Sequence, residues 1–194
     1  MSAPDEWLLV IDMQRVFADP PSPWISPDFY EVLPRVERLV DAFRGRVVLT
    51  RYVAPQAPSA AWIAYFEKFP SLLRPENDPV WDLKLAARES DFVATRTTFG
   101  KWDDRIARLV GAESTIAVCG VATECCVLST VLKAIDDGRR VRVVTDACAG
   151  GAPGANELTW SILAGFAPMA SLWTTLQVLS PDYAAQASGC GLIG

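Results

Sequence analysis

The sequence predicts a three-layer α/β/α domain, in which helices cover both faces of a mainly parallel sheet. Short apolar segments alternate with segments of helical periodicity along most of the chain, and this alternation is typical of parallel sheets with crossover helices. The length of 194 residues fits one domain that spans residues 1–194. Apolar residues make up 51% of the chain and charged residues 21%, close to the globular average, so disordered and fibrous proteins are excluded.

Six short segments rich in Val, Ile and Leu are the expected strands, and they span residues 7–11, 47–50, 91–95, 115–119, 141–145 and 170–173. Apolar residues at helical spacing, several times followed by a glycine, predict helices at residues 32–43, 59–68, 102–110, 123–137 and 154–165. The stretch 54–90 is rich in proline and aromatic residues and is too aromatic to be a flexible linker. We expect its apolar surface to support a homodimer or higher homo-oligomer.

Charge and hydropathy exclude several classes of protein. The net charge of −5 argues against binding nucleic acid through its phosphates. No apolar run approaches the roughly 18 residues that a membrane span needs, and the first residues lack the basic region of a signal peptide. The cysteines are odd in number and two are adjacent, which is typical of reduced thiols; they are Cys119, Cys125, Cys126, Cys148 and Cys190. We therefore expect a cytoplasmic protein that binds neither nucleic acid nor membranes.

Histidine is absent from the sequence. This excludes Ser-His-Asp and Cys-His catalysis, together with every metal site that uses imidazole. A general base in this protein must then be a carboxylate, a lysine, a tyrosine or a thiolate. We expect neither a metal nor another cofactor.

Two residues near the carboxyl ends of expected strands are candidates for chemistry, because ligands bind at these ends in open parallel sheets. Asp12 directly follows the first strand, where an acid is costly to bury unless it is paired. Cys126 lies in the first turn of the helix expected at 123–137, where Thr123 is the expected N-cap and the unpaired amides favour a reactive thiolate. Asp12 and Cys126 can act as base and nucleophile. The plainer alternatives are an acid that caps the next segment and a buried pair of cysteines.

Three stretches of the chain form a recognisable set of motifs: VIDMQ at 10–14 followed by Phe17, GVATECCV at 120–127 and VVTDA at 143–147. They resemble the isochorismatase-like cysteine hydrolases, a family that includes nicotinamidases, N-carbamoylsarcosine amidohydrolases, ureidoacrylate-type amidohydrolases and isochorismatases. The resemblance covers about residues 6 to 178, and the second stretch is its most specific part. It implies a six-stranded parallel sheet and assembly into a homo-oligomer.

The same resemblance implies the roles of several residues. Asp12 is the implied general base and Cys126 the implied nucleophile. A cis peptide is implied between Val121 and Ala122, and the amides of Ala122 and Cys126 would then form the oxyanion hole. The implied substrate is a small molecule.

The family's third catalytic residue, a lysine at the end of the third strand, is displaced in this chain. Arg96 occupies the position of that lysine, and Lys101 follows five residues later. An ammonium can approach a thiolate as a compact donor and can lose its proton, whereas a guanidinium cannot. We therefore hypothesise that Lys101 folds back into the site, and that Arg96 binds substrate or braces Asp12.

Two further features separate the members of the family. Nicotinamidases often carry iron or zinc held by histidines, which this chain lacks. Isochorismatases proper often lack the nucleophilic cysteine, so Cys126 favours hydrolysis of an amide or another C–N bond through a thioester. Two alternatives stay open: a vinyl-ether hydrolase of the isochorismatase type, in which Cys126 is a bystander, and a non-catalytic ligand-binding subunit, because the lysine is displaced.

The substrate pocket is expected to be small and partly apolar. The residues expected to line it are Gln14, Phe17, Trp24, Trp62, Phe66 and Trp81. For each aromatic residue, a place in the core or in a subunit contact is an equally good interpretation.

Overall fold

The six strands form one parallel sheet in the order β3-β2-β1-β4-β5-β6 in the computed structural model, which describes residues 6–180. The strands are β1 (Glu6–Ile11), β2 (Val47–Tyr52), β3 (Phe92–Arg96), β4 (Thr115–Val121), β5 (Arg140–Ala149) and β6 (Ala170–Trp173). The central pair, β1 and β4, is aligned from Glu6 opposite Thr115 to Ile11 opposite Gly120. Asp12 and the residues after Gly120 therefore leave the sheet side by side.

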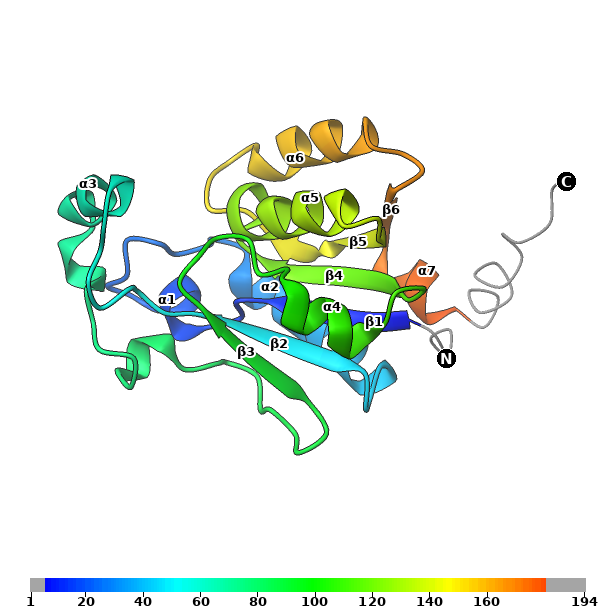
Figure 1. Ribbon diagram of the computed structural model, residues 1–194, viewed down its shortest axis with the longest axis horizontal. Coiled ribbons are helices and arrows are strands. Elements are labelled where there is room, and N and C mark those ends of the chain that lie inside the picture. The colour runs from blue at the N-terminus through cyan, green and yellow to red at the C-terminus, as the bar shows by residue number, and fades with distance from the viewer. Residues whose placement is uncertain (1–5, 181–194) are drawn as a thin grey trace, which may run out of the picture.

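Helices cover both faces of this sheet and confirm the predicted three layers. Figure 1 shows α4 (Asp104–Val110), α5 (Leu128–Asp136) and α6 (Ala155–Ala164) on one face, with α2 (Phe29–Ala42) and α7 (Thr175–Leu179) on the other. The short helix α1 (Arg15–Ala18) follows β1. None of the helices in the range 6–180 is long and apolar enough to cross a lipid bilayer.

The segment between β2 and β3 is ordered, as its aromatic composition predicts. It contains α3 (Ala61–Lys68) and two single 3-10 turns, η1 (Pro70–Leu72) and η2 (Pro79–Trp81). In Figure 1, α3 lies beyond the carboxyl ends of the strands, on the left. This segment therefore covers the edge of the sheet at which Asp12 emerges.

The structure differs from the sequence-based expectation in two places near this edge. The helix expected at 123–137 begins with one turn of π-helix, η3 (Thr123–Val127), before α5 starts. Thr123 does not cap it, because its hydroxyl is buried without a hydrogen-bond partner in the described part of the chain. The fifth strand continues past Asp146, whose Oδ1 accepts hydrogen bonds from the amide and hydroxyl of Thr175 at 2.7 and 2.9 Å. Asp146 therefore fixes the start of α7.

Gly120 allows β1 and β4 to approach closely just before the chain enters η3. Its φ is 117°, and a Cβ atom at this position would lie 2.1 Å from the carbonyl oxygen of Ile11. Any other residue would push the two strands apart at the point where Asp12 leaves the sheet. The glycine is thus required by the geometry of the site as well as by the turn.

Candidate active site

Asp12 lies fully buried at the carboxyl end of β1, in a left-handed backbone conformation with φ 48°. Its Oδ1 accepts a hydrogen bond of 2.7 Å from the hydroxyl of Thr50, and its amide donates to the same hydroxyl at 3.1 Å. Its Oδ2 lies 2.9 Å from Nζ of Lys101. Among the described residues, Oδ2 accepts no well-aligned hydrogen bond, so this oxygen remains available to accept a proton.

Lys101 is also fully buried and reaches Asp12 from the loop between β3 and α4. Its Nζ donates to the carbonyl of Thr98 at 2.6 Å and lies 4.7 Å from the centre of the Tyr52 ring. The loop packs directly on α5, because a Cβ atom on Gly100 would lie 3.2 Å from the carbonyl oxygen of Ser129. This close packing turns the lysine inward.

Arg96 is held elsewhere. Its guanidinium pairs with the carboxylate of Asp103 at 2.6 to 2.7 Å. Asp103 in turn caps α4 by accepting from the amides of Arg105 and Ile106. The expectation that Arg96 braces Asp12 does not match these contacts: the arginine stabilises the start of α4, because the capping acid is its nearest partner.

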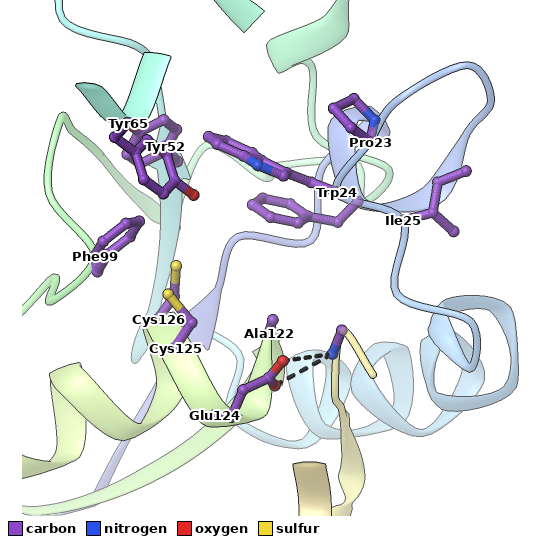
Figure 2. A pocket seen from close by; sticks show the side chains of 12 residues that line it. Pro23, Trp24, Ile25, Tyr52, Tyr65, Phe99, Ala122, Glu124, Cys125 and Cys126 are labelled. Atoms are coloured by element: carbon purple, nitrogen blue, oxygen red, sulfur yellow. Dashed lines mark hydrogen bonds between the residues drawn. The ribbon is translucent and has the colours of Figure 1, made fainter. Parts of the chain in front are cut away.

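Cys126 lies in η3 with its side chain 3% exposed. In Figure 2 the sulfur atoms of Cys125 and Cys126 both point into a cavity. The hydroxyl of Thr130 donates to the carbonyl of Cys126 at 2.6 Å and accepts from the amide of Lys101 at 3.0 Å. A single threonine therefore joins the backbones that carry the thiol and the cation. The peptide bond between Val121 and Ala122, which precedes η3, is cis.

The two adjacent thiols influence each other's ionisation. A hydrogen bond with Cys125 and burial raise the pKa of Cys126 well above its usual value; the charge on Asp12 adds to the rise and Lys101 opposes it. The same hydrogen bond lowers the pKa of Cys125. The hydrogen bond with Cys125 and burial therefore oppose ionisation of the Cys126 thiol, in contrast to the reactive thiolate that the helix start predicts. Its proton must be removed when it attacks.

The cavity in front of the two thiols has a volume of about 180 Å³, enough for a small molecule. Its lining residues are Phe17, Pro23, Trp24, Ile25, Tyr52, Tyr65, Phe99, Ala122, Glu124, Cys125, Cys126 and Gly151. Aromatic rings form one side of it, on the left and at the top of Figure 2. The ring of Trp24 stacks on Phe17 at 5.8 Å between centroids, and Tyr65 meets Phe99 edge to face at 5.6 Å.

Of the residues expected to line the pocket, Phe17 and Trp24 do so, whereas Gln14, Trp62, Phe66 and Trp81 do not. The side-chain amide of Gln14 donates to the carbonyls of Tyr52 and Trp81 and accepts from the amide of Tyr52, so it joins β2 to η2. Trp62 packs against Phe66 and Phe99, behind the aromatic rings that line the cavity. These side chains support the rings that face the cavity.

Sequence reasoning missed Tyr52, Tyr65, Phe99 and Glu124 as lining residues. Two of them carried a signal. Tyr52 ends the second strand at the edge where ligands bind, and Glu124 lies inside the GVATECCV stretch. Tyr65 lies on α3 and Phe99 in the loop between β3 and α4, and no local pattern shows which way either ring points.

The donor set of the site does not fit a zinc or iron ion. The sequence has no histidine, and among residues 6–180 no group of three or more Cys, Asp or Glu side chains is arranged so that it could hold a metal ion. The carboxylate of Asp12 is already engaged by Thr50 and Lys101. The coordination that such ions take from protein side chains, with three or four nitrogen, sulfur or oxygen donors, is therefore not available here.

Solved structures with a similar fold come from several hydrolases. A cysteine hydrolase from Pseudomonas syringae pv. phaseolicola 1448A superposes with a TM-score of 0.80 at 19% identity, over 94% of this chain and 93% of that chain. The pyrazinamidase of Pyrococcus horikoshii, solved in complex with zinc, gives 0.73 at 24% identity, over 88% and 99%. A nicotinamidase from Bacillus subtilis gives 0.68 at 17% identity, over 87% and 99%.

Sequence comparison adds the family. No curated protein is similar enough to this chain to count as a relative. The family model of the Isochorismatase domain, however, matches residues 6–174, which is most of the chain and includes Asp12, Lys101 and Cys126. The chain therefore belongs to the family of proteins with an isochorismatase domain.

Proposed function

We propose that this protein hydrolyses a small amide or another C–N bond through a thioester on Cys126. Asp12 is the general base and acid, Lys101 is the cation beside it, and no metal takes part. The observation that carries the proposal is the fully buried pair of Asp12 and Lys101, 2.9 Å apart, next to a cysteine that faces a small cavity. Nicotinamidases and a pyrazinamidase among the similar structures support hydrolysis of an amide.

In the first half-reaction, the proton of the Cys126 thiol passes to Oδ2 of Asp12 while the sulfur attacks the carbonyl carbon. In water this proton transfer would cost roughly 6 kcal/mol, the difference between the usual pKa values of the two groups. The positive charge of Lys101 lowers this cost because it stabilises the thiolate as it forms. The amides of Ala122 and Cys126 hold the oxyanion. When the C–N bond breaks, the protonated Asp12 gives its proton to the leaving nitrogen.

In the second half-reaction, water attacks the thioester carbon and Asp12 accepts one of its protons. The second tetrahedral intermediate collapses with cleavage of the C–S bond, and Asp12 returns the proton to the sulfur. A carboxylic acid leaves the site, and the thiol of Cys126 is restored. Asp12 thus serves as base and acid in each half, in a chain without histidine.

The two alternatives are supported less well by the geometry. In a vinyl-ether hydrolase Cys126 would be a bystander, although its sulfur faces the cavity. A non-catalytic subunit was suggested by the displaced lysine, but Lys101 lies in contact with Asp12 despite its shifted position. Both observations favour a working nucleophile and base.

The experiment that tests the proposal is trapping of a thioester by intact-mass spectrometry. The wild-type protein and a Cys126→Ala variant are mixed with primary amides, N-carbamoyl compounds and isochorismate, and quenched in acid. We expect the wild type alone to gain the mass of an acyl group from at least one C–N substrate. Hydrolysis that persists in Cys126→Ala, or cleavage of isochorismate alone, would contradict the proposal.

We also propose that the protein works in the cytoplasm as a homo-oligomer. The reaction needs a reduced thiol, and Cys119, Cys125, Cys126 and Cys148 are all free. Cys190, expected to be reduced as well, lies outside the described residues.

A further inference from the structure

The charged groups around the cavity are distributed unevenly. Among the described residues, the lining contains one carboxylate, that of Glu124, and neither a lysine nor an arginine. Lys101 and Arg96, the two cations considered for the site, are already paired, Lys101 with Asp12 and Arg96 with Asp103. A ligand in the cavity therefore meets a negative charge that no cation of the lining balances.

Glu124 keeps most of its capacity to bind a donor. Both oxygens of its carboxylate share one N–H group, that of Gly151, at 3.0 and 3.2 Å. A carboxylate can accept about four hydrogen bonds, so one shared donor leaves the majority of positions free. Within residues 6–180, no lysine or arginine forms an ion pair with Glu124. Its charge also raises the pKa of Cys125, which places it near the reacting end of the cavity.

The hydroxyl of Tyr52 is a second polar group that points to a ligand. Tyr52 is 1% exposed, and its hydroxyl has no hydrogen-bond partner in the described part of the chain. Figure 2 shows this oxygen directed into the cavity. Buried polar groups are almost always satisfied, so we expect a bound molecule to supply the partner.

Aromatic rings lie across the cavity from the carboxylate. In Figure 2, Trp24 and Tyr65 occupy the side opposite Glu124. The faces of such rings attract ammonium and guanidinium groups, most strongly where water is excluded. A cation between these rings and Glu124 would be stabilised from two sides. A carboxylate would be repelled by Glu124, and the lining has no lysine or arginine to compensate.

We infer that the cavity selects small amides that carry a cation, such as an ammonium group, over neutral amides and above all over amides that carry a carboxylate. Glu124 and the ring faces bind the cation, and the Tyr52 hydroxyl bonds to a polar atom of the same molecule. The inference rests on the proposed function, because the amide carbonyl must reach Cys126. It also disfavours isochorismate, which carries two carboxylates.

The test uses two sets of amides, each with one member that carries a positive charge, one that is neutral and one that carries a negative charge. The aliphatic set is 3-aminopropanamide, butanamide and succinamate, and the aromatic set is 4-(aminomethyl)benzamide, benzamide and 4-carbamoylbenzoate. Ammonia release gives kcat/KM for the wild type, and calorimetry with Cys126→Ala gives Kd without turnover. We expect the cation to exceed the anion by at least about tenfold in one set, the size of effect that a charge contact and a cation–π contact supply.

Two variants assign the effect to its residue. Glu124→Gln keeps an oxygen that can accept from the amide of Gly151, and we expect it to reduce the ratio of kcat/KM between cation and neutral amide at least about fivefold. Glu157→Gln removes the same charge from the exposed side of α6, outside the cavity, and should leave that ratio unchanged. Thermal unfolding of both variants reports any loss of the loop around Gly151.

The outcomes separate this inference from the proposed function. Amide hydrolysis without a preference for cations, or with a preference that survives Glu124→Gln, overturns the inference and leaves the proposed function standing. Binding of the cation to Cys126→Ala that depends on Glu124, with no turnover of any amide by the wild type, supports the inference and removes the proposed function. Failure of all six compounds to bind or react overturns the inference.

Discussion

Nζ of Lys101 lies 2.9 Å from Oδ2 of Asp12, and neither side chain is exposed to solvent. Two charges that leave water together lose hydration, and their mutual attraction returns only part of that free energy. Removal of one partner is expected to cost about 3–5 kcal/mol of stability, because the other charge is then buried alone. Variants of this pair therefore change folding as well as catalysis, and the experiments must separate the two.

We predict that Asp12→Asn lowers turnover at least about a hundredfold, the effect of losing a general base. The chain has no histidine, and Asp12 is the group that we propose moves the proton between sulfur and nitrogen. The variant also leaves Lys101 unpaired, so its midpoint of unfolding should fall. The double variant with Asp12→Asn and Lys101→Met removes both charges and should recover stability but not activity. Recovery of activity in the stable double variant would show that Asp12 is not the base.

The cation is assigned by comparing Lys101→Met with Arg96→Met. Lys101 lowers the pKa of Cys126, so we predict that its removal raises this pKa further and slows thioester formation at least about tenfold. Arg96→Met breaks a partly exposed pair with Asp103 and should cost up to about 1 kcal/mol of stability. The rate of acylation of Arg96→Met should stay within about threefold of the wild type, because the Arg96 guanidinium pairs with Asp103, the residue that caps α4. The reverse pattern would make Arg96 the catalytic cation.

Chelators are predicted to leave the activity unchanged, although one structure with a similar fold contains zinc. The reason is the donor set: no imidazole exists in the chain, and Asp12 is occupied by a lysine and a threonine. The measurement is the rate after dialysis against EDTA and against 1,10-phenanthroline, together with metal analysis of the purified protein. Stoichiometric zinc or iron whose removal abolishes turnover would contradict this prediction.

Much of the fold and part of the site were predictable from local sequence. The strands and long helices follow from apolar periodicity, and the place of Asp12 follows from the end of a buried strand. The contact between Lys101 and Asp12 was hypothesised from the chemistry of an ammonium, not from position. The partner of Arg96 could not be predicted, because it depends on where Asp103 lies once α4 forms.

The pocket wall was less predictable for a physical reason. Its rings come from β2, from the helices α1 and α3 and from loops, and in each of these an aromatic side chain can face either the cavity or the core, which are both apolar. Trp62 and Phe66 lie behind the wall, whereas Tyr65 from the same helix lines it. The rise in the pKa of Cys126 was also missed, because its causes, which are the hydrogen bond with Cys125, burial and the charge of Asp12, depend on how the side chains pack in the folded chain.

Assembly is predicted to be a homodimer or a higher homo-oligomer. The stretch 54–90 was expected to provide the contact surface, but two of its aromatic residues, Phe66 and Trp81, are buried within the chain. Exposed apolar side chains gather instead around α6, where Leu158 is 62% exposed and Ile162, one turn later, is 40% exposed. Sedimentation at micromolar concentration should show an oligomer that Leu158→Glu weakens. Ile63→Glu, on α3, serves as the matched control; a monomeric wild type would refute the prediction.

The last prediction concerns the two adjacent thiols. The sequence favours Cys126 as the reactive thiol, but the hydrogen bond between the pair raises the pKa of Cys126 and lowers that of Cys125. We therefore predict that Cys125→Ala lowers the pKa of Cys126, because the hydrogen bond that holds its proton is lost. Conversely, Cys126→Ala should raise the pKa of Cys125 and slow its alkylation at neutral pH.

The measurement is the rate of modification by iodoacetamide as a function of pH, with the labelled peptide identified by mass spectrometry. Cys119 and Cys148 provide internal controls, because burial raises the pKa of both, that of Cys148 to about 12, and both should stay unmodified at neutral pH. Acylation by a substrate amide should occur on Cys126 even where Cys125 alkylates faster, because the proposed mechanism pairs Cys126 with Asp12 as its base. An acyl group found on Cys125 would identify Cys125, not Cys126, as the nucleophile. Labelling of Cys148 before Cys125 and Cys126 would show that burial does not govern thiol reactivity here.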